Sequence, residues 1–83
     1  MGKDLKAGRS AKQMTVNRYL LRRMIDNNGG VRKFSENTGL SRQAIYNTLN
    51  GKTPNYYTIR VISEGLRLTD EQLLAVWFNR GEL

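Results

Sequence analysis

The chain contains no cysteine and no histidine among its 83 residues. Without cysteine it forms no disulfide and offers no thiolate to a metal ion, which suits a reducing cytoplasm. Without histidine it lacks the most frequent general base of catalytic sites and the imidazole ligand of zinc sites. Because only seven carboxylates are scattered along the chain, we expect no metal site, no cofactor and no enzymatic activity.

Long apolar runs are also missing from this sequence. No run approaches the ~20 apolar residues that a membrane-spanning helix needs, and no signal-peptide core opens the chain. The length is sufficient for one domain with a single hydrophobic core. We therefore expect one small cytoplasmic domain that has no membrane partner.

Acidic residues are scarce, above all in the first part of the chain. Lys and Arg number fourteen against seven Asp and Glu, for a net charge of +7. Residues 1–52 hold eleven of the cations and three of the acids, whereas residues 53–83 hold three and four. A DNA duplex carries one negative charge per ~1.7 Å of its axis, so this basic excess favours nucleic-acid binding. Scattered Lys and Arg also serve simply to solvate a surface, and charge alone does not separate these two interpretations.

The spacing of the apolar residues predicts helices. No segment alternates apolar and polar residues for long enough to form a strand, whereas several segments have apolar residues at helical spacing. The predicted helices run from about residue 15 to a stop at residues 27–30, then over 31–38, 42–50 and 56–66. A last helix is predicted after a Thr69–Gln72 capping box. The fold class is therefore all-α with five helices.

Residues 34–51, FSENTGLSRQAIYNTLNG, are predicted to form two short helices joined by a tight turn. Gly39 suits the left-handed backbone at the end of the first of these helices, and Ser41 suits the N-cap of the second. Leu40 and Ile45 have the spacing of a hydrophobic staple, and Ile45 shares one helical face with Leu49. In a basic chain this pattern indicates a helix-turn-helix that reads duplex DNA in the major groove.

These residues also resemble a known family. The likeness rests on Gly39-Leu40-Ser41, on Ile45, on the ending Asn50-Gly51-Lys52-Thr53-Pro54, and on Thr58 and Ile59 beyond it. Together they resemble the helix-turn-helix of lambda-repressor-like domains, the Cro and phage-repressor (XRE-type) family, over residues 15–78. The chain departs from the family pattern at Val31, where glutamine is frequent, at Ser35, usually alanine, and at Thr48, often a large apolar residue. Val31 has no polar group, so the contact expected at its position is assigned to Arg32.

The resemblance implies a five-helix lambda-repressor-like fold with the helix-turn-helix at the second and third helices. It also implies sequence-specific binding to double-stranded DNA by a transcriptional regulator, most simply a repressor of a phage, mobile-element or autoregulated operon. Residues 38–52 have some likeness to addiction-module antitoxins as well, so an antitoxin that binds a toxin protein is one alternative. A module that binds DNA without sequence preference, or that binds another protein, is the other.

Contacts with DNA are assigned to three sets of residues. Base reading by the helix at 42–50 is assigned to Arg42, Gln43, Tyr46 and Asn47, because Arg pairs with guanine and Gln or Asn with adenine in the major groove. Contacts with the phosphate backbone are assigned, partly from the resemblance, to Arg32, Lys33, Ser41, Asn50, Lys52 and Thr53. Residues 1–14 are predicted to be a basic flexible arm, or else a simple tail, ahead of a domain at 15–83, with arm contacts assigned to Lys3, Lys6, Arg9 and Lys12.

The last predicted helix is more apolar than one buried face requires. Leu73, Leu74, Val76, Trp77 and Phe78 follow its capping box, and part of this set is expected to complete the core. The remainder, assigned to Trp77 and Phe78, is expected to join two copies in a homodimer, with burial in the core as the alternative for both. Two copies related by a twofold axis place their recognition helices ~34 Å apart, so the expected DNA target is an inverted-repeat operator.

Overall fold

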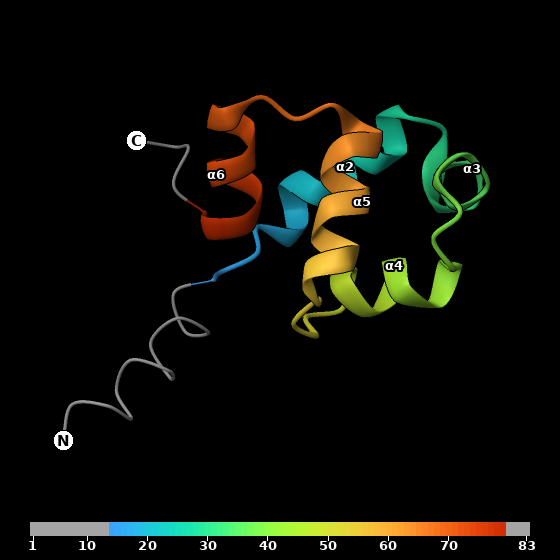
Figure 1. Cartoon of the computed structure of the whole chain (residues 1–83), viewed down its shortest axis with the longest axis horizontal. Helices are drawn as coiled ribbons and strands as arrows, with labels where there is room; N and C mark the ends of the chain where they lie inside the picture. Colours follow the sequence, from blue (N-terminus) through green and yellow to red (C-terminus); the bar gives the residue numbers. More distant parts are fainter. Residues whose placement is uncertain (1–13, 80–83) are drawn as a thin grey trace, which may run out of the picture.

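The computed structural model describes residues 14–79, which form five helices and no strand (Figure 1). The helices are α2 (Arg18–Asn27), α3 (Gly30–Thr38), α4 (Arg42–Leu49), α5 (Tyr56–Leu66) and α6 (Asp70–Phe78). In Figure 1, α6 lies at the left and α3 and α4 lie to the right, with α2 and α5 between them. The expected all-α fold is confirmed for this part of the chain. Among the described residues, no helix has the length and apolar character that crossing a membrane requires.

Helix α2 begins at Arg18, three residues later than the sequence predicts. Asn17 is the N-cap, and its side-chain oxygen accepts a hydrogen bond from the backbone N–H of Leu20 at 3.1 Å. The backbone N–H of Asn17 donates to the carbonyl of Val76 at 2.7 Å, and its side-chain nitrogen donates to Asn79 Oδ1 at 3.1 Å. Asn17 is thus held against the end of α6 and caps α2, so the helix starts only after it.

The boundary between arm and domain also needs a small correction. Met14, assigned to the arm, is half-buried and packs against the hydrophobic core, as does Val16. The folded part of the chain therefore includes residue 14. The remaining arm residues, with the candidate contacts Lys3, Lys6, Arg9 and Lys12, lie outside the described residues.

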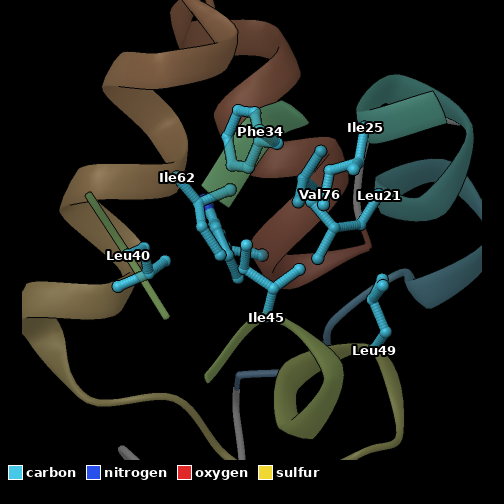
Figure 2. Close-up of a cluster of buried hydrophobic side chains, with 9 residues drawn as sticks. Leu21, Ile25, Phe34, Leu40, Ile45, Leu49, Ile62 and Val76 are labelled. Atoms are coloured by element: carbon cyan, nitrogen blue, oxygen red, sulfur yellow. The ribbon is translucent and has the colours of Figure 1, made fainter. Parts of the chain in front are cut away.

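The hydrophobic core draws on all five helices and on the turn after α3. Its buried members are Leu21, Ile25, Phe34, Leu40, Ile45, Leu49, Ile62, Val76 and Trp77. Figure 2 shows Ile25 and Val76 on one side of this cluster and Ile62 on the other. Since each helix adds at least one side chain to the same cluster, the helices are expected to lose their positions together when the core is disrupted.

Helix α5 has the predicted bounds, but one of its residues has a role that the sequence did not indicate. Gly65 lies in the last turn of this helix. A Cβ atom at this position would lie 2.8 Å from Thr38 Cγ2 and 2.9 Å from Phe34 Cζ. Glycine at this position therefore permits the close approach of α5 to α3, the helix that precedes α4.

Helix α6 begins with the predicted capping box. Thr69 Oγ1 accepts from the backbone N–H of Gln72 at 3.1 Å, and Gln72 Oε1 accepts from the backbone N–H of Thr69 at 2.9 Å. Trp77 is 0% exposed, and its indole N–H donates to Ser63 Oγ at 2.8 Å. The assignment of Trp77 to a dimer contact is therefore wrong, because this side chain has no surface to offer a second copy. Phe78 is half-buried, and the exposed apolar residue of α6 is Leu74.

Candidate nucleic-acid interface

The turn between α3 and α4 is held by side chains of α3. Gly39 has the expected left-handed backbone, with φ of 81°, and its N–H donates to the carbonyl of Ser35 at 2.9 Å. Ser35 Oγ donates to the carbonyl of Leu40 at 2.7 Å, and the N–H of Leu40 donates to Thr38 Oγ1 at 3.2 Å. Ser35, where the family usually has alanine, thus adds a hydrogen bond as well as being small. These bonds fix where α4 starts relative to α3.

Both ends of α4 have the expected local signals. Ser41 is the N-cap, and its side chain accepts from the backbone N–H of Ala44 at 3.1 Å. At the other end Gly51 has a φ of 104°, and the N–H of Lys52 donates to the carbonyl of Asn47 at 2.9 Å. The helix therefore ends after two turns, and the chain then leads through residues 51–55 to α5.

One face of α4 is buried against the core. Ile45, Thr48 and Leu49 are its buried residues. Thr48 is buried without cost to its hydroxyl group, because Oγ1 donates to the carbonyl of Ala44 at 3.0 Å. Burying an isoleucine or leucine side chain, such as Ile45 or Leu49, stabilises a fold by about 1.5–3 kcal/mol. The core thus anchors α4 from behind and determines which of its side chains face outward.

The four residues assigned to base reading lie outside the buried face of α4. Arg42, Gln43 and Tyr46 are exposed, and Asn47 is half-buried. Tyr46 has 42% of its surface exposed. Gln43 Nε2 donates to Asn47 Oδ1 at 2.9 Å, so two of the four are in contact with each other. The structure therefore leaves all four with surface that a nucleic acid is able to reach.

Exposed cations precede α4 in the sequence, in α3, and follow it at Lys52. Arg32 and Lys33 are exposed in the first turns of α3, where Gly29 provides no side-chain cap for the helix N–H groups. Arg32 Nε lies 3.6 Å from Glu36 Oε2 in a highly exposed ion pair, which contributes little stability and leaves the guanidinium accessible. Beyond α4, Asn50, Lys52 and Thr53 are exposed.

Arg18, which is not among the assigned site residues, lies against the end of α4. A Cβ atom at Gly51 would lie 3.1 Å from Arg18 Nη1, so the guanidinium rests against the stop of α4. Arg18, Gly51, Lys52 and Thr53 line part of one recess of about 320 Å³. None of the described residues that line this recess is a carboxylate. No pattern in the sequence signals the contact, because Arg18 and Gly51 are brought together only by the packing of α2 on α4.

Metal chemistry has no visible place in the described part of the chain. Among residues 14–79, no three Asp, Glu, His or Cys side chains gather as ligands for an ion. Buried side-chain polar atoms in the same residues all have hydrogen-bond partners.

No family model, curated protein or solved structure matches this chain. The likeness to lambda-repressor-like domains therefore rests on the quoted residues, and function has to be argued from the site itself.

Proposed function

We propose that this protein is a sequence-specific double-stranded DNA-binding regulator in which α3, the turn at residues 39–41 and α4 form a helix-turn-helix. One observation carries the proposal: α4 is buried on one face and presents exposed Arg, Gln and Tyr side chains and a half-buried Asn elsewhere, with exposed cations before and after it in the sequence. A helix of this kind fits the major groove, whose width of about 12 Å admits an α-helix.

The chemistry of the exposed face matches the edges of bases. The Arg42 guanidinium donates two hydrogen bonds to O6 and N7 of guanine, and the Gln43 amide both accepts from N6 and donates to N7 of adenine. Each such bidentate contact contributes about 1–3 kcal/mol of discrimination between bases. Tyr46 and Asn47 extend the same face by one turn. Arg42 and Gln43 are therefore the principal specificity residues of the proposal.

Phosphate contacts position the helix in the groove. Arg32 and Lys33 serve one flank, with Ser41 at the start of α4, and Asn50, Lys52 and Thr53 serve the other. We add Arg18 to this second flank, because its guanidinium lies against Gly51 next to Lys52. Each phosphate neutralised by these residues releases counterions, so binding is expected to weaken steeply as the salt concentration rises.

The proposed target is an inverted-repeat operator occupied by two copies of the protein. A single α4 reads only half of such a site, and a twofold axis sets the two helices ~34 Å apart. Binding over a promoter would block polymerase, which makes repression the simplest regulatory outcome. Since Trp77 is buried, a contact between copies through α6 has to use Phe78 and the exposed Leu74.

Selection from a random duplex library at physiological salt tests the whole proposal. An enriched inverted repeat is expected, and its spacing reports the separation of the two recognition helices. Arg42→Ala and Gln43→Ala should each weaken binding to the selected site about 5- to 150-fold and leave affinity for random DNA nearly unchanged. Equal affinity for every duplex would instead support the module without sequence preference.

Arg18→Gln tests the added backbone contact. The variant should bind all duplexes more weakly, and the slope of log affinity against log salt should fall by about 0.9, the value for one lost phosphate contact. Arg67→Asn is the matched control, because Arg67 ends α5 far from α4 along the helix and Asn tolerates its left-handed backbone, with φ of 56°. An unchanged slope for Arg18→Gln would remove Arg18 from the interface.

A further inference from the structure

Gln43 and Asn47 form a side-chain pair on the exposed face of α4. Gln43 Nε2 donates to Asn47 Oδ1 at 2.9 Å. The two residues are four apart in the helix, a spacing at which Gln and Asn side chains bond directly to each other. Both were assigned to base reading as separate residues. Their contact gives one of them a different role.

The hydrogen bond sets which way round the Gln43 amide lies. Its Nε2 points toward Asn47, so its Oε1 points away from it. Reversing this amide alone would place two oxygens opposite each other, which is repulsive. A primary amide has two N–H hydrogens and one carbonyl oxygen, so Oε1 and one N–H of Gln43 are left free. One acceptor and one donor on the same amide are what the major-groove edge of adenine requires.

Asn47 is well placed to hold this orientation. Its backbone carbonyl accepts from the N–H groups of Lys52 at 2.9 Å and of Asn50 at 3.2 Å, so its backbone is anchored at the end of α4. Its side chain is half-buried and lines a recess of about 200 Å³ together with Ala44 and Thr48. Gln43, by contrast, is exposed. The more buried side chain of Asn47 thus restricts the more exposed side chain of Gln43.

We propose that Asn47 is a positioning residue for Gln43, and that Gln43 held in this way reads a single A·T base pair. This inference rests on the proposed function. Holding a long polar side chain in its bound orientation removes part of the entropic cost of binding, which corresponds to about a 2- to 12-fold gain in affinity. The gain applies only where Gln43 meets adenine, so Asn47 adds to discrimination without contacting a base of its own.

The test compares the wild type with Gln43→Ala, Asn47→Ala and the double variant on the selected operator and on every single-base change of it. Gln43→Ala and Asn47→Ala should lose discrimination at the same base pair, with the Asn47→Ala loss about 2- to 12-fold. The double variant should lose no more than Gln43→Ala alone, because the two residues act as one unit. The slope of log affinity against log salt should be the same for all three variants as for the wild type. A general loss of docking would instead change this slope.

Asn47→Asp is the decisive variant. Aspartate keeps an acceptor oxygen for Gln43 Nε2 and has no donor, so it preserves only the orientation stated above. Its charge is repelled by phosphates, so affinity should fall equally for all duplexes while discrimination at the A·T pair is retained. Thermal unfolding of each variant checks that the fold is intact.

Two results would overturn the inference while leaving the proposed function standing. In the first, Asn47→Ala loses discrimination at a different base pair from Gln43→Ala, which would mean that Asn47 reads its own base. In the second, Asn47→Asp loses discrimination as fully as Asn47→Ala. A wild type with no base preference anywhere would overturn the proposed function, and this inference with it.

Discussion

Helices α4 and α6 are similar in length and in the type of their N-cap, but the charges in their first turns are opposite. Each begins with a side-chain hydroxyl as its N-cap, Ser41 in α4 and Thr69 in α6. The first turn of α6 contains Asp70 and Glu71, which suit the positive end of a helix dipole. The first turn of α4 has no acid and begins with Arg42. Helix α6 is thus arranged for stability, whereas α4 gives up a favourable interaction at the residue proposed to read guanine.

The same contrast extends to the halves of the chain that contain these helices. Neither α2 nor α3 has an acid in its first turn, and each carries an arginine there, Arg18 and Arg32. The segment from residue 53 onward has more acids than cations, whereas residues 1–52 have a net charge of +8. A fold selected for stability alone would match acids to all of its helix starts. Helix α5 also lacks an acid in its first turn, but only α2, α3 and α4 carry an arginine there. An arginine at these three helix starts is what the proposed binding of a polyanion would favour.

The largest expected effect comes from the buried face of α6. Trp77→Ala should lower the free energy of unfolding by about 3–5 kcal/mol, because it leaves a cavity and removes the bond to Ser63 Oγ. Urea denaturation measures the change. Leu74→Ala, on the same helix and 46% exposed, is the control and should change stability by no more than about 0.5 kcal/mol. A larger loss for Leu74→Ala would mean that α6 packs against the core through the face that carries Leu74.

Gly65→Ala tests the contact between α5 and α3. Alanine is the better helix former by about 1 kcal/mol, so the substitution would stabilise an isolated helix. Here its Cβ would lie 2.8 Å from Thr38 Cγ2 and 2.9 Å from Phe34 Cζ, so these side chains must shift. We expect a net loss of about 1–3 kcal/mol in the free energy of unfolding. A thermal midpoint above that of the wild type would contradict the close packing.

Removing the two N-caps sharpens the comparison between α4 and α6. Thr69→Ala and Ser41→Ala should each lower the free energy of unfolding by about 0.5–2 kcal/mol. The loss should be larger at Thr69, because the reciprocal bond with Gln72 depends on the same turn. Below the unfolding transition, Thr69→Ala should leave DNA affinity unchanged, whereas Ser41→Ala should weaken it. Affinity measured on the selected operator separates the two variants.

Arg42→Glu has the smallest expected effect on stability and the most diagnostic pair of readouts. Glutamate at the start of α4 suits the helix dipole, so the free energy of unfolding should rise by about 0.3–1 kcal/mol. The same change should abolish binding to the operator, since an anion replaces the guanidinium at the groove. The mirror variant Asp70→Lys should instead lose about 0.3–1 kcal/mol of stability and keep operator binding. Loss of stability in Arg42→Glu would show that Arg42 has a structural role.

Local signals in the sequence predicted most of the helices and their caps. Ser41 and Thr69 cap helices where their residue types and spacing indicated, and α5 has the predicted bounds. Each of these features depends on groups within about one helical turn of each other, which is the range over which a capping side chain acts. The exposure of Gln43 was predictable in the same way, because Gln43 lies on the side of α4 opposite Ile45. Arg42, three residues before Ile45, is exposed at the start of the helix.

The features that were missed depend on partners far along the chain. Helix α2 starts late because the N–H of Asn17 bonds to Val76, and Trp77 is buried because α6 turns it toward Ser63. Arg18 joins the candidate interface because α2 packs beside Gly51. No local pattern in the sequence indicates contacts between residues so far apart along the chain.

The amino-acid sequence by itself determined the helical character of the chain, the caps of its helices and the separation of charge between its two halves. These follow from backbone preferences and from hydrogen bonds between near neighbours. Only the tertiary structure decided that α3 packs closely against α5 at Gly65, that Trp77 is buried in the core and that Arg18 lies beside Lys52. The physical reason is that one shared core sets the distances between helices, and those distances decide which side chains meet.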